Sequence, residues 1–189
     1  RAGEGEPRRL QRLDGAVVPA MPNLHSHAFQ RALAGRTGLV APGHDDSFWT
    51  WRDVMYGFAL KLGPEDLEAV AAQLYVEALK SGFSVIGEFQ YLHHQPDGTP
   101  YDEVAELSLR CISAAERAGI AITMLPTLYN FGGFGGQASV AGQRRFVNGA
   151  ERYLRIHDTL SQVSRTHPLR RLGISPQSLR AVTVDLLNE

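Results

Sequence analysis

The sequence predicts an α/β fold in which parallel strands alternate with helices. Short segments rich in β-branched and aromatic residues recur along the chain, and each is followed by a longer segment whose apolar residues repeat every three or four positions. Glycine or proline separates the two kinds of segment. Such near-continuous apolar strands are typical of a parallel sheet covered by helices. Four units of this kind suit either a doubly wound sheet or half of a (β/α)8 barrel, which needs about 250 residues when complete.

The first strand is expected within residues 15–27, where an apolar run leads into a loop that carries histidines. Residues 47–62 are apolar and aromatic and predict a helix. A second helix begins at Pro64, in the first turn that proline favours, and ends at Gly82.

The second strand is expected at residues 83–92 because β-branched and aromatic residues dominate there. The next helix is predicted over 102–119, with Asp102 as its N-cap and Gly119 at its C-terminus. The remaining predictions are a third strand at 120–129, a helix from about 142 to 164, a fourth strand at 170–176 and a final helix after Val182.

Composition limits the classes of function. The chain has 189 residues, of which 43% are hydrophobic and 21% charged, as in ordinary soluble domains. A formal net charge of -1 argues against nucleic-acid binding, which normally needs a basic excess. Cys111, the single cysteine, excludes an internal disulfide and is expected in the core. No apolar run approaches the roughly 18 residues of a membrane span, so we expect a cytoplasmic protein without membrane partners.

Both ends of the sequence suggest a piece of a longer protein. The chain begins with Arg1 rather than methionine, and a helical pattern starts near Val182 and stops about one turn later. We therefore expect residues 1–14 to be the remnant of an N-terminal flanking segment. Residues 15–189 are then a partial barrel of about four βα units.

The clearest candidate for chemistry is the pair His25 and His27. On a strand, side chains two residues apart point to the same face, about 6.5–7 Å apart along the backbone. Two imidazoles placed in this way can bind one metal ion at about 2.0–2.1 Å per bond. The pair is expected at the carboxyl end of a strand, where sites of parallel α/β proteins lie. Two surface histidines in a loop would be the simpler interpretation of the spacing alone.

The segment that contains these histidines, MPNLHSHAFQRALAG (21–35), resembles the first-strand motif of the amidohydrolase superfamily, and more narrowly that of formimidoylglutamate deiminases of histidine degradation. The resemblance covers almost the whole chain from about residue 15. It continues through SFWTWRDVMY (47–56), GEFQYLHHQPDGTPY (87–101), GFGGQ (133–137), GQRRF (142–146) and SLRAVT (178–183).

This resemblance implies the first half of a zinc-dependent (β/α)8 deiminase that hydrolyses N-formimidoyl-L-glutamate to N-formyl-L-glutamate and ammonia. It implies one zinc ion per chain, with His25 and His27 as two of its ligands. It also implies a small dicarboxylate substrate, and a homodimer when the protein is complete. The positions that match substrate-binding residues are Gln30, Arg52, Tyr91, Gln177 and Arg180. Arginine suits a carboxylate because its planar fork binds both oxygens.

Two departures from the family pattern limit this expectation. Gln177 stands where the pattern has histidine, and glutamine cannot carry a charge or shuttle a proton. The remaining metal ligands and the acid–base residues are expected beyond Glu189, so we predict no catalytic residue in the chain and no turnover by it alone.

Weaker signals receive simpler interpretations. His93 and His94 are adjacent and are expected in a loop rather than as joint ligands. Glu88 is either a buried, paired carboxylate or a support of the site. The pairs Arg8–Arg9, Arg144–Arg145 and Arg170–Arg171 are predicted to be solvated surface charges. The aromatic group Phe48, Trp49, Trp51 and Tyr56 is predicted to pack in the core or to wall a pocket.

Two other functions remain open. A related deaminase of a guanine- or cytosine-like ring would not need Arg52 and Arg180, which a dicarboxylate requires. A non-catalytic remnant would expose an apolar sheet edge and would be expected to aggregate or dimerise.

Overall fold

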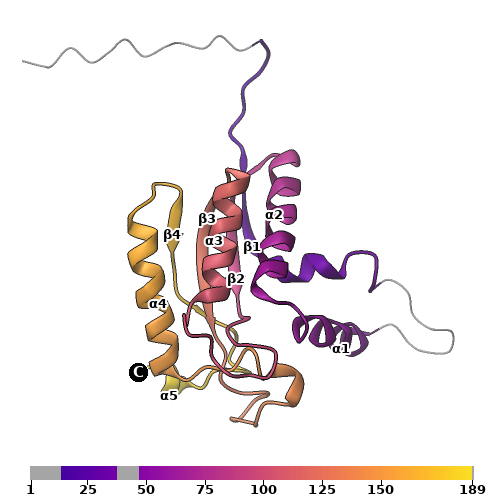
Figure 1. The fold of residues 1–189 in the computed structure, drawn as a ribbon, viewed down its shortest axis with the longest axis vertical. Coiled ribbons are helices and arrows are strands. Elements are labelled where there is room, and N and C mark those ends of the chain that lie inside the picture. Colours follow the sequence, from indigo (N-terminus) through magenta and orange to yellow (C-terminus); the bar gives the residue numbers. More distant parts are fainter. Residues whose placement is uncertain (1–13, 38–46, 189) are drawn as a thin grey trace, which may run out of the picture.

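The computed structural model describes residues 14–37 and 47–188, which form a parallel sheet with helices (Figure 1). Its strands are β1 (Met21–Ser26), β2 (Phe83–Gln90), β3 (Ala121–Leu128) and β4 (Arg170–Leu172). They pair in the order in which they occur along the chain, and the short β5 (Ser175–Pro176) also pairs with β3. A doubly wound sheet reverses its strand order at a switch point, whereas a barrel adds strands in sequence. The α/β prediction is therefore confirmed, in its barrel form.

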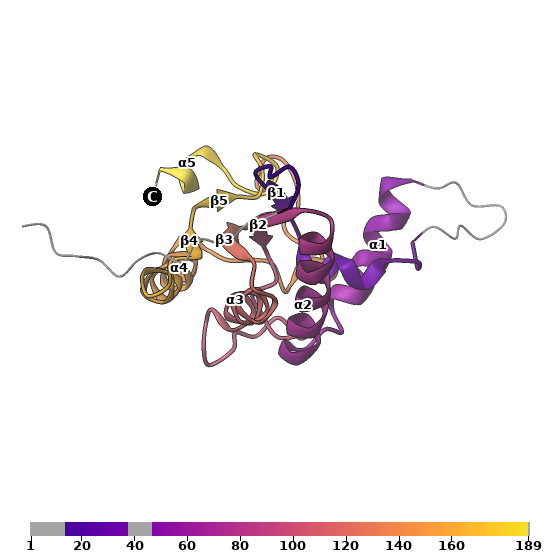
Figure 2. The ribbon, with the colours of Figure 1, turned by 90° about the horizontal axis from the view of Figure 1, so that it is seen from above.

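The helices lie where a barrel requires them. Figure 2 shows α2 (Pro64–Lys80), α3 (Glu106–Ala118) and α4 (Ala150–Arg165) together on one face of the sheet. A doubly wound sheet would place helices on both faces. The shorter elements are η1 (Ala28–Leu33), α1 (Phe48–Ala59), η2 (Ala141–Gln143) and α5 (Val184–Leu187).

The main core lies between the sheet and these helices. Ile86 of β2, Ile122 of β3 and Leu67 of α2 are almost completely buried there. Cys111 of α3 is also fully buried, as predicted. Burial of each large apolar side chain contributes roughly 1.5–3 kcal/mol to folding, so this layer holds the strands in position.

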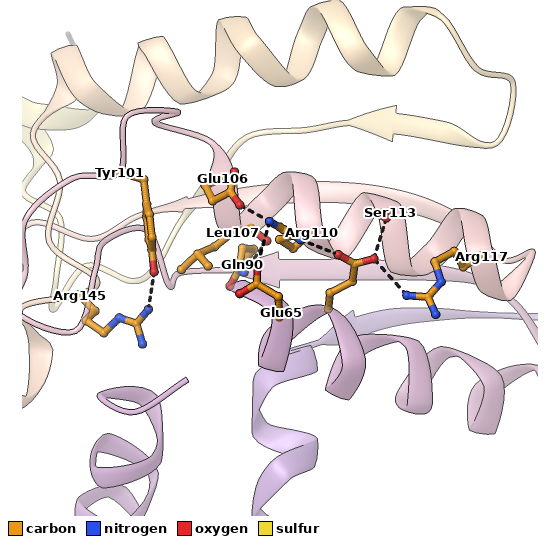
Figure 3. A network of polar contacts seen from close by, with 10 residues as sticks. Glu65, Gln90, Tyr101, Glu106, Leu107, Arg110, Ser113, Arg117 and Arg145 are labelled. Carbon is orange, nitrogen blue, oxygen red and sulfur yellow. Dashed lines mark hydrogen bonds and ion pairs between the residues drawn. The ribbon is translucent and has the colours of Figure 1, made fainter. Parts of the chain in front are cut away.

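An ion-pair cluster joins the outer surfaces of α2 and α3 (Figure 3). Arg110 bonds to Glu106 on its own helix at 2.8 Å and to Glu68 on α2 at 3.1 Å. Glu68 also accepts hydrogen bonds from Ser113 and Arg117, and these donors, with Arg110 the largest contributor, lower the pKa of its carboxyl group. The cluster is partly exposed to solvent, so each pair contributes at most about 1 kcal/mol.

Several element boundaries differ from the sequence prediction. Helix α3 begins at Glu106 with Ala105 as N-cap, so the prediction of Asp102 as its cap was wrong. Helix α4 begins at Ala150 rather than near residue 142. The predicted fourth strand is two short strands, β4 and β5, separated at Gly173. The helix predicted over 47–62 ends at Ala59. The predicted end of α3 at Gly119 is confirmed, and its φ of 81° provides the left-handed C-cap.

Arg145 overturns the prediction that the arginine pairs are solvated. Its side chain is fully buried. Its Nε donates to the carbonyl oxygen of His94 at 2.7 Å, and its Nη1 donates to the carbonyl oxygens of Ala59 and Leu62. Because the main-chain amides of His93 and His94 donate to the Arg145 carbonyl oxygen, the residue also ties two loops together. The Arg8–Arg9 pair and most of the predicted flanking segment 1–14 lie outside the described residues.

Within the described ranges 14–37 and 47–188, no helix is long and apolar enough to cross a membrane.

Candidate functional site

A cavity of about 320 Å³ opens at the carboxyl ends of the strands. This is the end of the sheet at which barrel enzymes place their sites. Residues from β1, β2 and β3, from helix α1 and from the segment after β5 form its walls. The structure brings every candidate residue of the sequence prediction to this one cavity: His25, His27, Gln30, Arg52, Tyr91, Gln177 and Arg180.

The two histidines converge, as the spacing predicts. Their Nε2 atoms lie 3.0 Å apart, whereas the intervening Ser26 is buried on the other side of the strand. The Nδ1 atom of His27 lies 2.9 Å from the carbonyl oxygen of Phe89, which can only accept a hydrogen bond. That contact places the proton of a neutral His27 on Nδ1 and leaves the lone pair of Nε2 directed toward His25.

This geometry fits a metal ion. Two nitrogens that bind one tetrahedral zinc ion lie about 3.4 Å apart at the usual bond lengths, close to the observed separation. Metal-bound histidines commonly donate their other ring N–H to a carbonyl oxygen, as His27 does to Phe89. Among the described residues no group of three His, Cys, Asp or Glu side chains is placed to hold a metal. The two histidines are therefore a partial ligand set, and their role as ligands stays a prediction.

Burial affects the protonation of His27. Desolvation lowers the pKa of its imidazole, with a smaller opposing effect from the hydrogen bond to Phe89 and a further lowering by His25. The other histidine, His25, stacks on the Phe89 ring with 4.4 Å between ring centroids. The two rings are thus held by β2, the neighbouring strand, as well as by β1.

Gln30 and Tyr91 form one wall of the cavity. The Gln30 side chain, on η1, donates from Nε2 to the Tyr91 hydroxyl at 2.7 Å. The Tyr91 ring packs edge-on against His27, with 5.0 Å between centroids. Burial is the main cause that raises the pKa of Tyr91, so its hydroxyl stays protonated and can donate into the cavity.

Two arginines face the cavity from different parts of the chain. Arg52 projects from α1, with its guanidinium carbon 5.6 Å from the centroid of the Tyr56 ring. Arg180 follows β5, and its Nη1 donates to the carbonyl oxygen of Gly132 at 2.9 Å. The Gln177 side-chain oxygen accepts from Ser178 at 2.5 Å and lies 3.5 Å from Arg180 Nη2. The cavity therefore combines two cationic groups with neutral hydrogen-bonding groups.

A buried carboxyl group lies behind the histidines. Glu88 of β2 accepts a hydrogen bond from the main-chain N–H of Ala28 at 2.6 Å and from the Tyr75 hydroxyl at 3.2 Å. Burial raises the pKa of Glu88 to about 7, although these hydrogen bonds act in the opposite direction. Glu88 is thus buried and hydrogen-bonded, as one of the two interpretations predicted, and its bond to Ala28 lies directly after His27, whereas its support of the site stays a prediction.

His93 and His94 lie in the loop after β2 and point to different partners. The Nε2 atom of His93 is 2.9 Å from the carbonyl oxygen of Thr127, and that of His94 is 2.9 Å from the carbonyl oxygen of Val147. Burial lowers the pKa of His93 to about 4. The two histidines therefore do not bind one ligand together, which confirms the sequence prediction. His93 contacts β3 at Thr127, a residue that borders the cavity.

The sequence interpretation missed Tyr129 and Gln143. Tyr129 directly follows β3 and borders the cavity, and Gln143 is buried behind it. Tyr129 occupies the same kind of position as Tyr91, one residue beyond a strand end, and that placement was the available signal. The aromatic group at 48–56 was predicted correctly as a possible wall, since Phe48, Trp51 and Tyr56 border the cavity.

Comparison with known proteins gives one match in sequence and several in structure. No family model matches the chain. The chain is 52% identical over 177 residues to formimidoylglutamate deiminase from Pseudomonas aeruginosa strain PAO1, which covers 92% of the chain and 38% of that enzyme. A crystal structure of an amidohydrolase from Brucella melitensis superposes with a TM-score of 0.86 at 48% identity, over 90% of the chain and 38% of that protein.

A more distant structure shares the fold. The zinc complex of an atrazine chlorohydrolase from Arthrobacter aurescens TC1 superposes with a TM-score of 0.68 at 17% identity, over 89% of the chain and 36% of that protein. The chain thus spans a little over a third of the length of the relatives that it matches. Its strands and helices correspond to part of a larger amidohydrolase fold, and its sequence resembles that of a formimidoylglutamate deiminase almost throughout.

Proposed function

We propose that this chain, which resembles a formimidoylglutamate deiminase over nearly all of its length, is part of a metal-dependent hydrolase of the same specificity. The whole protein would convert N-formimidoyl-L-glutamate and water to N-formyl-L-glutamate and ammonia. The proposal rests on one observation above all, namely that two imidazoles and two guanidiniums from separate elements meet at one cavity. The 52% identity to an enzyme named for this activity supports it.

Arg52 and Arg180 are the proposed carboxylate-binding residues. The substrate carries two carboxylates, and each arginine can bind one of them through paired N–H donors. The hydrogen bonds from Arg180 to the Gly132 carbonyl oxygen and to the Tyr129 hydroxyl hold its guanidinium at the cavity wall and leave further N–H groups for a carboxylate. A neutral ring substrate offers no partner for two cations, which favours the dicarboxylate over a guanine- or cytosine-like ring.

Gln30, Tyr91 and Gln177 are the proposed neutral substrate contacts. Gln30 and Tyr91 lie beside His27, so we assign them to the formimidoyl end, where the bond to nitrogen is broken. Gln177 lies beside Arg180 and is assigned to the same end of the substrate as that arginine. As an amide, Gln177 can orient the substrate but cannot transfer a proton to the departing ammonia.

His25 and His27 would hold a zinc ion together with ligands from outside the described residues. Zinc in such a site supplies a water nucleophile at neutral pH. The contributions of this chain are then to fix the two imidazoles through Phe89 and Glu88 and to position the formimidoyl carbon beside them. The group that protonates the leaving ammonia is expected elsewhere in the protein.

Ammonia release by the whole protein tests this proposal. We expect release from N-formimidoyl-L-glutamate, and none from guanine or cytosine under the same conditions. Arg180→Lys keeps the charge but loses the fork, so it should raise KM about tenfold or more. Zinc-loaded protein that releases no ammonia from N-formimidoyl-L-glutamate would refute the substrate assignment, and release from guanine would support the ring alternative.

A further inference from the structure

We propose that the Tyr129 hydroxyl group is an additional substrate-binding donor, which binds the same carboxylate as Arg180, and that Gln143 fixes the direction of this donor. The inference rests on the proposed dicarboxylate substrate and adds a specificity-determining residue to it. It follows from the hydrogen bonds behind the cavity wall, whose donors and acceptors can be assigned one by one.

The amide of Gln143 has a fixed orientation. Its side-chain oxygen accepts from the main-chain N–H of Val140 at 2.9 Å, and a main-chain N–H can only donate. The amide nitrogen must therefore face the other way, toward the two tyrosines. Gln143 is 2% exposed, so water does not compete for these bonds.

Both tyrosine oxygens act as acceptors of this nitrogen. Gln143 Nε2 lies 2.8 Å from the Tyr129 hydroxyl and 3.1 Å from the Tyr56 hydroxyl, and its two hydrogens can serve one each. The two hydroxyls carry two protons of their own. At most one of these protons can lie between the two tyrosines, so at least one O–H must point elsewhere, and both residues border the cavity.

The contacts of Tyr129 indicate that its O–H group is one that points away from the other tyrosine. Its oxygen also lies 3.3 Å from Nη2 of Arg180, a group that can only donate. Gln143 Nε2 and Arg180 Nη2 therefore both donate to the Tyr129 oxygen and occupy its two lone pairs. The Tyr129 oxygen can accept no further hydrogen bond, so it can offer only its own proton to another group, and the proposal directs this proton into the cavity that Tyr129 borders.

This arrangement suits one carboxylate oxygen beside Arg180. The guanidinium carbon of Arg180 lies 5.8 Å from the centroid of the Tyr129 ring, so the hydroxyl and the guanidinium border the same part of the cavity. A substrate carboxylate would accept from both. A primary amide at that position would bring its own N–H groups toward two donors, and the pair therefore selects a carboxylate over an amide.

The test uses the whole protein and the variant Tyr129→Phe. Loss of a hydrogen bond to a charged group should raise KM for N-formimidoyl-L-glutamate about tenfold to hundredfold, with kcat changed less than about twofold. Tyr101→Phe is the matched control, because the Tyr101 hydroxyl also accepts from an arginine, Arg145, at 3.4 Å but does not border the cavity. It should leave KM unchanged.

Two further measurements address direction and selectivity. Gln143→Met removes the donors that orient Tyr129, so it should raise KM severalfold alone and add little in the Tyr129→Phe background. Binding of N-formyl-L-glutamate and of its two monoamides, measured by calorimetry, should show that Tyr129→Phe reduces the preference for the diacid over one of the monoamides.

The outcomes separate this inference from the proposed function. Wild-type protein that turns over N-formimidoyl-L-glutamate with the same KM as Tyr129→Phe would overturn the role of Tyr129 and leave the proposed function intact. Additive effects of Gln143→Met and Tyr129→Phe would overturn the role of Gln143. Wild-type protein that neither binds the diacid nor releases ammonia would overturn both the proposed function and the inference, and the wild-type measurement alone reveals that case.

Discussion

The substitution Glu88→Gln should change how the stability of the protein depends on pH. The Glu88 carboxyl group is 1% exposed and lies between the Ala28 amide and the Tyr75 hydroxyl. Glutamine has the same shape and can keep both contacts, since its oxygen can accept from Ala28 and its nitrogen can donate to Tyr75. The substitution therefore removes the titration of this site with little change in packing.

The magnitude follows from the pKa. Burial raises the pKa of Glu88 from 4.5 to about 7, a difference of 2.5 pH units, so the folded protein binds more protons than the unfolded chain between these values. The contribution of the protonated group is fully present below pH 4.5 and is lost as the pH rises through 7. At 1.36 kcal/mol per unit, the loss is about 3 kcal/mol.

Urea unfolding at pH 5, 6, 7 and 8 measures this effect on wild-type protein and Glu88→Gln. The buried histidines titrate in both proteins and cancel in the difference between their free energies of unfolding. Between pH 5 and pH 8 we expect the free energy of unfolding of the wild-type protein to fall by about 2.5 kcal/mol relative to that of the variant. Parallel curves for the two proteins would show that Glu88 titrates normally and would refute the reasoning.

Three further predictions concern metal binding and stability. If the whole protein binds the proposed single zinc ion per chain, His27→Ala should reduce the bound zinc to a small fraction, measured by elemental analysis. Arg145→Met leaves three buried carbonyl oxygens without their donor and should destabilise by roughly 3 kcal/mol or more, measured as a fall in Tm. Gly119→Ala, at a φ of 81°, should destabilise by about 1 kcal/mol, whereas Gly57→Ala within α1 should stabilise by a similar amount in the same urea experiment.

The repeating units of the fold were predictable because they depend on local patterns. Apolar periodicity identified α2 and α3, and terminal glycines such as Gly119 placed their ends within a residue or two. The start of α4 was not predictable in this way. Residues 142–149 look compatible with a helix, but Phe146 and Arg145 are buried by contacts with distant segments, and those contacts hold the backbone in a turn.

The residues of the candidate site also differ in whether local sequence patterns could predict them. His25 and His27 could be found from strand geometry, because residues two apart on a strand share a face. Arg52 and Gln177 could be named only through the resemblance to a family, since their positions depend on where α1 and the segment after β5 pack. Arg145 was misjudged because two adjacent arginines usually lie in solvent, and the carbonyl groups that receive it come from residues 51 and 86 positions away.

The distance in sequence between Arg145 and its acceptors determines when these contacts can form during synthesis of the chain. Arg145 holds the C-terminal end of α1 through Ala59, and the two residues are 86 positions apart in sequence. At a synthesis rate of about 5–20 residues per second, α1 emerges roughly 4–17 s before the side chain that fastens it exists. During that interval the hydrogen bond from Arg145 that holds the end of α1 cannot form. The wall of the cavity that carries Arg52 is therefore completed only after the third strand has been translated.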